Sequence, residues 1–245
     1  MKLQFVGCGD AFGSGGRFNT CFHVTGERVN FLIDCGASSL IAMKRLGIDG
    51  NAIHLILITH FYADHFGGLP FFILDAQFFA KRTAPLVVAG PPGLRDRAIE
   101  VTEADFPGAS ETRHRFDLTM MELEDRQTVT IDGIRVTPFQ VNVGRPGGPF
   151  FAYRIEAEGK VLAYTGDSEW SEALIDAGRE ADLFIAEAYF RDKQVPLHLD
   201  LATLEQRLDD IRPRRLVLTH MSESMLAERE DVPYQTAEDG MMIEF

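Results

Sequence analysis

Five short apolar segments of this chain each end in an acidic side chain or a histidine, and this pattern restricts the fold strongly. Each segment has the length of a β-strand and is rich in Leu, Ile, Val or Phe, which is typical of strands buried on both faces. The residues that end the five segments are Asp34, His60, Asp167, Glu187 and His220. If the strands run side by side in one direction, these polar groups meet at one edge of a layered α/β protein, where such proteins bind ligands.

The most polar of these strand ends is residues 59–65, Thr-His-Phe-Tyr-Ala-Asp-His, which directly follow residues 54–58, a nearly continuous apolar stretch. Two imidazoles and a carboxylate within six residues are nitrogen and oxygen ligands that suit zinc, iron or manganese. Carboxylates gathered at one edge repel each other unless they are protonated or a cation compensates them. We therefore expect a metal ion here; a histidine-rich turn without an ion is the alternative.

The composition places limits on the partner and the compartment. The net charge is −13, from 24 Lys and Arg against 37 Asp and Glu, whereas proteins that bind polyanions usually show the opposite balance. No segment approaches the ~18 apolar residues needed to cross a bilayer, and the first residues lack a signal-peptide pattern. Three cysteines without C-x-x-C spacing are expected to be reduced thiols of a cytoplasmic protein.

The remaining sequence predicts alternating strands and helices without repeats or a linker, so we expect a single domain over residues 1–245. Strands are expected at residues 3–7, 21–24, 29–33, 54–58, 85–90, 128–131, 135–139, 150–156, 160–165, 183–186, 215–219 and 241–245. Helices are expected at residues 38–46, 68–81, 94–106, 172–177 and 201–211. The glycine-rich residues 7–16 either approach a ligand through bare backbone or form a flexible turn. We expect the phenylalanines of residues 71–79 in the core and His114 in solvent.

Residues 59–65 resemble the metal-binding motif T-H-x-H-x-D-H of the metallo-β-lactamase-fold hydrolases, with Tyr62 in place of the second histidine. Residues 165–168, Thr-Gly-Asp-Ser, resemble the T-G-D-[ST] motif of the same family, and residues 218–222 resemble its last histidine motif. The resemblance covers nearly the whole chain and is closest to the branch of tRNA 3′-processing enzymes and small phosphodiesterases. It implies an α/β fold of four layers, an αββα sandwich.

The resemblance also implies a set of metal ligands. One of the two metal sites of the family is complete in this chain, and its residues are Asp64, His65, Asp167 and His220. The other site retains His60 but has Tyr62 in place of its second histidine, and Val143 is the nearest counterpart of its third. We therefore expect one divalent ion per chain, zinc ahead of manganese or iron.

Two residues are candidates for catalysis on the same grounds. Asp64 would lie beside the expected water and accept its proton, unless the metal engages it. His198 matches a histidine that faces the substrate in several relatives, where it would protonate a leaving group or hold a phosphate. A residue of a surface loop is the alternative for His198.

These observations predict a metal-dependent hydrolase that acts on a small ester, with a phosphodiester favoured. The chain shows no long Gly/Pro- and Lys-rich arm of the sort that grips tRNA, so we expect a small-molecule substrate instead of bulk nucleic acid, and no membrane. A homodimer is compatible with the sequence. The alternative is a non-catalytic member of the fold that binds a ligand or regulates, because Tyr62 and Val143 break the first metal site.

Overall fold

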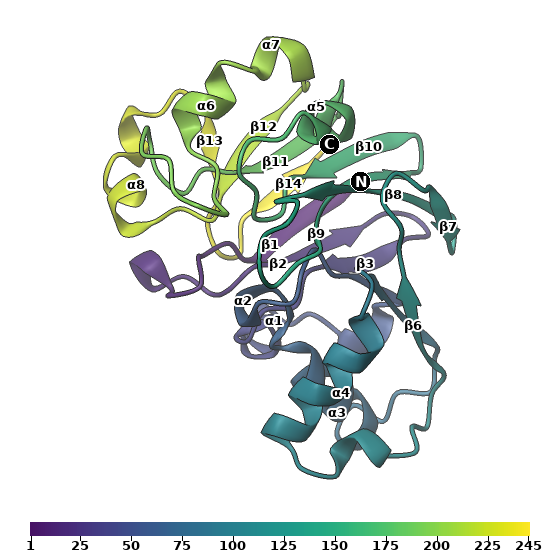
Figure 1. The fold of residues 1–245 in the computed structure, drawn as a ribbon. Coiled ribbons are helices and arrows are strands. Elements are labelled where there is room, and N and C mark those ends of the chain that lie inside the picture. Colours follow the sequence, from purple (N-terminus) through teal and green to yellow (C-terminus); the bar gives the residue numbers. More distant parts are fainter.

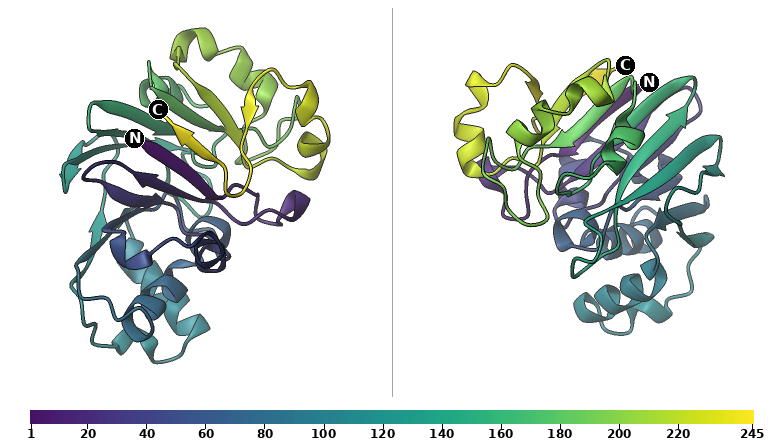
Figure 2. Two further views of the ribbon diagram at one scale, coloured as in Figure 1. Left: turned by 180° about the vertical axis from the view of Figure 1, so that it is seen from behind. Right: turned by 45° about the horizontal axis from the view of Figure 1, so that its top comes forward.

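Two seven-stranded sheets lie face to face, and helices cover the outer face of each sheet (Figures 1 and 2). The structure is a computed structural model that describes residues 1–245. Three clusters of buried apolar side chains lie between these layers: one between the two sheets, and one between each sheet and its own helices. The predicted four-layer αββα sandwich is therefore confirmed.

The first sheet has the order β14-β1-β2-β3-β4-β5-β6. Strands β3 to β6 are parallel, whereas β14, β1, β2 and β3 pair antiparallel. The strands are β1 (Lys2–Gly7), β2 (Cys21–Thr25), β3 (Asn30–Ile33), β4 (Leu55–Leu57), β5 (Leu86–Gly90), β6 (Leu118–Glu122) and β14 (Met242–Glu244). Its helices are α1 (Ser39–Leu46), α2 (Ala63–Phe66), α3 (Leu69–Phe78) and α4 (Leu94–Asp105), with short 3-10 turns η1 (Ser14–Gly16), η2 (Gly50–Ala52) and η3 (Ala109–Glu111).

The second sheet has the order β13-β12-β11-β10-β9-β8-β7, and strands β10 to β13 are parallel. Its strands are β7 (Val129–Ile131), β8 (Ile134–Val141), β9 (Phe150–Ala157), β10 (Lys160–Tyr164), β11 (Leu183–Glu187), β12 (Leu216–Thr219) and β13 (Gln235–Thr236). The helices of this half are α5 (Ala173–Gly178), α6 (Leu201–Glu205), α7 (Leu208–Ile211) and α8 (Glu223–Ala227), followed by the turn η4 (Arg229–Asp231).

Some elements differ from the sequence prediction. The expected helix at residues 201–211 is two helices, α6 and α7, because the apolar spacing of Leu201, Leu204, Leu208 and Ile211 continues across the break and does not reveal it. The edge strands β6 and β13 and the short helices α2 and α8 were not predicted. They are short or partly exposed, so their apolar periodicity is weak.

The phenylalanines of α3 also differ from the prediction. Only Phe72 is buried in the core, whereas Phe71, Phe78 and Phe79 are 41%, 54% and 79% exposed. Phe71 and Phe78 are seven residues apart, which places them on the same side of the helix, away from the sheet. All three cysteines are free and buried, as expected.

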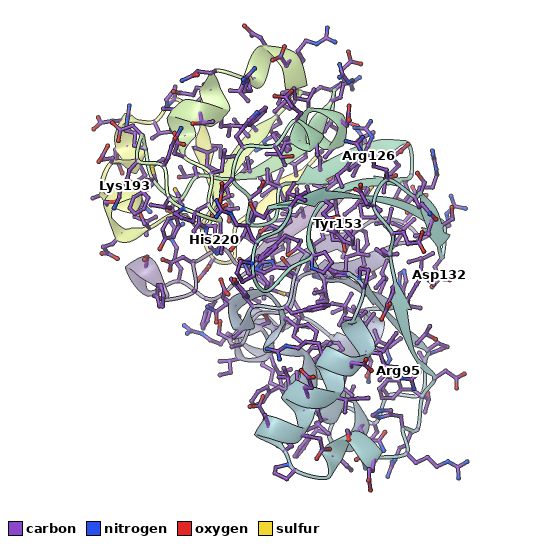
Figure 3. All side chains as sticks on the ribbon, viewed as in Figure 1. Arg95, Arg126, Asp132, Tyr153, Lys193 and His220 are labelled. Atoms are coloured by element: carbon purple, nitrogen blue, oxygen red, sulfur yellow. The ribbon has the colours of Figure 1, made fainter.

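Backbone contacts hold the strand ends of the two sheets together. The Tyr153 hydroxyl of β9 donates to the Ile58 carbonyl (2.6 Å), and the Phe151 amide donates to the Thr59 carbonyl (2.9 Å). Tyr153 lies between the sheets, and His220 lies where the second half of the chain meets the first (Figure 3). The predicted convergence of the strand ends at one edge is thus confirmed.

The glycine-rich segment before β2 packs against its own chain and does not form an open ligand loop. A Cβ atom on Gly7 would lie 2.0 Å from the Asn19 carbonyl oxygen, so only glycine allows this close approach. The neighbouring Cys8 carbonyl accepts the His220 amide at 3.1 Å. The loop therefore fixes the backbone of a candidate ligand.

Candidate metal centre

Helix α2 brings Asp64 and His65 to the edge between the sheets. It follows β4 after a short extended segment, and its backbone packs tightly against the end of β3. The Cys35 amide donates to the His65 carbonyl at 2.7 Å, and a Cβ atom on Gly36 would lie 2.1 Å from the Asp64 carbonyl oxygen. Gly36 is thus required for this close packing, which buries both side chains of α2.

Four side chains converge on one point from three segments of the chain. The Nε2 atom of His65 lies 3.0 Å from Oδ1 of Asp167 and 3.4 Å from Oδ2 of Asp64. The Nε2 atom of His220 lies 3.2 Å from the same Asp64 oxygen, 3.6 Å from the same Asp167 oxygen and 3.4 Å from Nε2 of His65. Ligand atoms around a tetrahedral zinc ion with bonds of about 2.0–2.1 Å are roughly 3.3 Å apart. The spacing of these four atoms fits such an ion.

The hydrogen bonds behind the two imidazoles leave their Nε2 lone pairs facing the centre. His65 Nδ1 lies 2.7 Å from Oδ2 of Asp34, and His220 Nδ1 lies 3.1 Å from Oε1 of Glu187. Because a carboxylate only accepts, each Nδ1 donates, and the neutral ring then carries no proton on Nε2. Two imidazole lone pairs and two carboxylates therefore meet without a donor, and Oδ1 of Asp167 is buried without a hydrogen bond.

This arrangement requires a positive charge. Burial lowers the pKa of His65 and His220, but the carboxylates around them, with Asp167 foremost, outweigh it and raise the pKa of both rings well above the ordinary value. Burial likewise raises the pKa of Asp64 and Asp167, but the histidines lower it below the ordinary value. A divalent cation would provide the same compensation without the extra protons. The residues present therefore fit a divalent metal ion.

His60 lies beside this cluster but outside it. Its ring is fully buried, its Nε2 atom has no hydrogen-bond partner, and the nearest carboxylate oxygen, Oδ2 of Asp167, is 3.8 Å away. Burial, together with the charge of His65, lowers the pKa of His60 to about 3, so the ring is neutral. Tyr62 packs against this ring with 5.1 Å between centroids, and its hydroxyl donates to the Pro146 carbonyl at 3.2 Å. His60 is thus the one imidazole on that side.

The structure corrects the assignment of Val143 as the counterpart of a ligand. Val143 is 75% exposed and lies outside the centre. Its neighbour Asn142 has a positive φ of 49° and donates from Nδ2 to the Asp167 carbonyl at 2.9 Å, while Oδ1 accepts the Glu169 amide at 2.8 Å. The resemblance indicated Val143 as the nearest counterpart of the missing histidine, but the side chain that contacts Asp167 is that of Asn142, at a left-handed backbone position.

His198 is part of the edge and not an isolated surface residue. Its Nδ1 atom bonds the Glu187 carboxylate and lies 3.9 Å from Oδ2 of Asp167, and its ring stacks on Tyr189 with 4.3 Å between centroids. Burial lowers the pKa of His198, but Glu187 and Asp167 raise it more, so the pKa lies above its ordinary value. The side chain remains 23% exposed, and it lines an open pocket with Arg145 and Trp170.

The sequence did not predict the contacts of three supporting residues. Asp34 and Glu187 were visible as polar strand ends, but their partners His65 and His220 are more than thirty residues away in sequence. The amide and the hydroxyl of Thr59 both donate to Asp34. The Oγ1 atom of Thr59 also lies 3.0 Å from Nδ1 of His60. Only the position directly before His60 gave a signal for Thr59.

Comparisons with known proteins relate the chain to one family and to several proteins of the same fold. Residues 1–242 match the profile of the family described as Anti-Pycsar protein Apyc1. A Ribonuclease Z of Methanosarcina acetivorans is 26% identical over an alignment of 273 positions, which covers 91% of this chain and 88% of the relative. Human tRNase Z, short form, superposes with a TM-score of 0.80 at 24% identity, covering 100% of this chain and 99% of the other. Zn(2+)-bound PqqB of Methylobacterium extorquens superposes with a TM-score of 0.74 at 16% identity, covering 100% of each chain.

These comparisons confirm the metallo-β-lactamase fold and correct one expectation. A small-molecule substrate, with bulk nucleic acid disfavoured, is the wrong prediction, because the sequence relatives are named as ribonucleases and the structural neighbour as a tRNase. The prediction relied on the lack of a Gly/Pro- and Lys-rich arm and on the net charge, which describes the whole surface and not the local field at a cleft. None of the helices is long and apolar enough to cross a bilayer.

Proposed function

Because the chain belongs to the Anti-Pycsar protein Apyc1 family, and its sequence relatives are named Ribonuclease Z, we propose that it is a metal-dependent hydrolase of phosphodiester bonds in RNA. The observation that carries this proposal is the set of four converging ligand atoms from Asp64, His65, Asp167 and His220, in which the neutral imidazoles, with their protons on Nδ1, present only lone pairs to the centre. We assign one divalent ion per chain to this set and propose zinc as its identity.

Each residue of the set has a separate task in this proposal. The two Nε2 atoms and the carboxylates of Asp64 and Asp167 would hold the ion, which would supply Lewis-acid chemistry. Asp34 and Glu187 hold the two imidazoles in the required tautomer from behind. Asp64 uses Oδ2 in the set, which leaves Oδ1 to accept a proton from the attacking water.

His198 acts on the leaving side of the bond in this proposal. Its Nδ1 faces Glu187, so its Nε2 is the atom that is free to contact substrate. With the raised pKa, the ring carries a proton that it can give to a leaving oxygen or direct at a phosphate. The pocket beside it contains Arg145, whose guanidinium lies 2.7 Å from Glu169 and offers further donors to a phosphate.

A non-catalytic protein that binds its ligand without cleaving it is the second candidate. Tyr62 favours it, because its ring occupies the side of His60 where the family places a further imidazole. One metal also lacks the paired clamp on the attacking and leaving oxygens that two metals provide. Binding without turnover is the behaviour that would distinguish this candidate.

The test uses a fluorescently labelled tRNA acceptor stem with a 3′ extension, incubated with the purified full chain and zinc or manganese. We expect cleavage that EDTA and Asp167→Ala abolish, whereas Asp209→Ala, an exposed acid of α7, leaves it unchanged. Retained RNA binding without cleavage would favour the second candidate. The absence of both RNA binding and RNA cleavage would contradict RNA as the substrate. The metal content measured in the same samples tests the assignment of the ion separately.

A further inference from the structure

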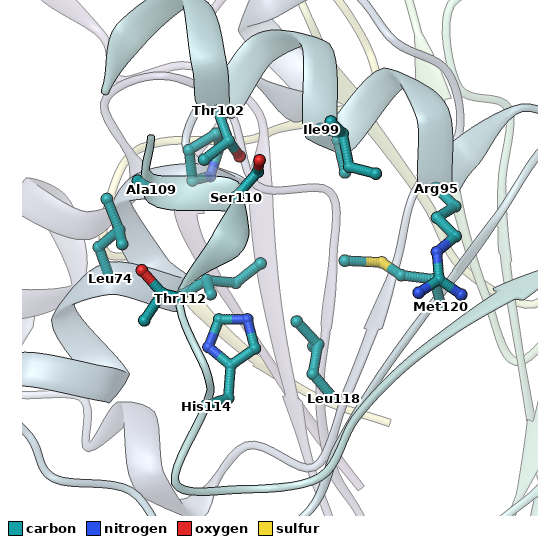
Figure 4. Close-up of a pocket in the computed structure, with 13 residues that line it drawn as sticks. Leu74, Arg95, Ile99, Thr102, Ala109, Ser110, Thr112, His114, Leu118 and Met120 are labelled. Atoms are coloured by element: carbon teal, nitrogen blue, oxygen red, sulfur yellow. The ribbon is translucent and has the colours of Figure 1, made fainter. Parts of the chain in front are cut away.

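A second cavity lies in the helical layer that covers the first sheet. It is bounded by α3, α4, the turn η3 and the edge strand β6, with an accessible volume of about 220 Å³ (Figure 4). None of its lining residues belongs to the candidate metal centre. An apolar cavity of about 150 Å³ admits benzene, so this space is large enough for a compound with a single ring.

The lining of the cavity combines apolar and polar side chains. Ile73, Ala98 and Met120 contribute the apolar surface, while Thr102 and Thr112 contribute hydroxyl groups. Figure 4 shows the imidazole of His114 pointing into the space between Thr112 and Leu118. Apolar pockets with a few convergent polar groups are typical of small-molecule sites.

His114 provides an unsatisfied polar atom at this place. Its Nδ1 atom is buried and has no hydrogen-bond partner, and burial lowers the pKa of the ring, which is therefore neutral. The expectation that His114 is solvated is thus wrong, because the ring is half-buried and packs against Phe116 with 5.3 Å between centroids. A buried polar atom without a partner costs free energy that a bound ligand can recover.

Arg95 provides the charge. It lies on α4 at the rim, next to Met120 in Figure 4, and it takes part in none of the ion pairs of the chain. Arg97, two residues further along the same helix, is paired with Glu100 at 3.0 Å. The planar donors of the Arg95 guanidinium, which no acidic side chain engages, match a carboxylate.

We infer that this cavity binds a small organic anion that consists of one apolar ring and one carboxylate. The ring occupies the space between α3, α4 and β6, the carboxylate faces Arg95, and His114 contacts the ligand through Nδ1. The inference does not depend on the proposed reaction, because no residue of the metal centre lines the cavity.

The probe is benzoate, titrated into the full chain by calorimetry, beside benzyl alcohol and acetate. We expect saturable binding of one benzoate per chain, weaker binding of benzyl alcohol and no binding of acetate. Arg95→Gln should weaken benzoate binding about tenfold or more, since a charge-assisted hydrogen bond is lost. The matched control Arg97→Gln should change the affinity less than twofold.

Two further measurements exclude other sites. The affinity for benzoate should be the same in the presence of EDTA and in Asp167→Ala as in the parent, because the cavity lies apart from the candidate metal centre. A benzoate bound at the metal centre would instead be lost under both conditions. Thr102→Phe places a ring in the cavity and should abolish binding; if this variant does not fold, a crystal soaked with benzoate locates the ring directly. The inference would be overturned if benzoate shows no saturable binding up to about 10 mM. It would also be overturned if Arg95→Gln and Arg97→Gln lose benzoate affinity equally.

Discussion

His65 Nδ1 lies 2.7 Å from Oδ2 of Asp34, a carboxylate that comes from the end of the neighbouring strand β3. Both side chains are fully buried, and the other oxygen of Asp34 accepts the Thr59 amide at 2.7 Å. Burial raises the pKa of Asp34 above its ordinary value, although His65 and Thr59 oppose this shift. Asp34 thus joins three elements of the edge and fixes the ring that presents Nε2 to the candidate ion.

Asp34→Asn should weaken metal binding by about 10- to 100-fold, the range usual for groups that orient a metal-binding histidine. The amide retains the size of the carboxylate but no longer favours the proton on Nδ1 of His65. Zinc affinity measured by competition with a chromogenic chelator tests this. Asp75→Asn, which alters an acid paired with Lys44 on the outer surface, serves as the control and should leave the affinity unchanged.

Asp167→Ala and His198→Ala should have different effects. Asp167 faces His65 and His220 inside the cluster, so its loss should remove the ion and the stabilisation by that ion. At 100 times the dissociation constant this stabilisation amounts to about 2.7 kcal/mol. His198 lies beside the cluster, so its alanine variant should keep the metal content and lose turnover. Elemental analysis and melting temperatures with and without EDTA give the comparison, and equal metal losses would contradict the division of roles.

Gly36→Ala should damage the metal centre although residue 36 carries no ligand. The new Cβ atom would meet the Asp64 carbonyl oxygen at 2.1 Å and force α2 away from β3. We expect a loss of at least 2 kcal/mol in the free energy of unfolding, typical of overpacking against backbone, together with weaker zinc binding. Gly50→Ala is the matched control, since its Cβ atom would lie 3.4 Å from the Phe72 ring, an ordinary contact.

The sequence predicted the convergence of the polar strand ends better than the contacts that support them. His60, Asp64, His65, Asp167 and His220 each follow an apolar strand, and parallel strands bring such ends together whatever the details of their loops. The role of Glu187 requires its contacts with His198 and His220, which only the three-dimensional arrangement provides.

Asn142 shows a second limit of the sequence. The resemblance indicated Val143 as the nearest counterpart of a ligand, and the sequence did not reveal the left-handed backbone at position 142, where Asn142 contacts Asp167 instead. In the same way, the polar residues 107–117 gave no sign of a cavity, which arises because the turn η3 returns over α3 and α4. Loop conformations that depend on tertiary contacts are the part that periodicity cannot supply.

His23 should make the stability of the chain depend on pH. Burial lowers the pKa of this ring below its ordinary value, and the hydrogen bond from Nε2 to Asn30, at 2.7 Å, opposes the shift only in part. The unfolded chain therefore binds the proton more readily, so the contribution of His23 is present above about pH 6.5 and is lost as the pH falls through the lowered folded value.

His23→Gln should accordingly show a smaller loss of unfolding free energy between pH 7 and pH 5 than the parent. Urea unfolding at both pH values in the presence of EDTA measures this, because the metal centre then titrates alike in both proteins. An identical loss in parent and variant would contradict the assignment.

The last prediction concerns the other metal site of the family, of which this chain retains only His60. As a hypothesis, the double variant Tyr62→His with Asn142→His should bind a second divalent ion beside His60. The ring of Tyr62 already packs against His60 at 5.1 Å between centroids, and Asn142 contacts the backbone of Asp167. Histidine is among the residues that tolerate the positive φ of position 142.

Without metal this double variant should be less stable than the parent, because Asn142 loses its bonds to the Asp167 carbonyl and the Glu169 amide, each worth about 1 kcal/mol. Metal should restore part of that difference through binding linkage. Tyr62→His with Val143→His is the control and should keep a single ion, since residue 143 is exposed and lies outside the centre. Zinc stoichiometry by elemental analysis, followed with melting temperature, distinguishes them. One ion per chain in a folded Tyr62→His, Asn142→His variant would show that His60 does not belong to a metal site in this protein.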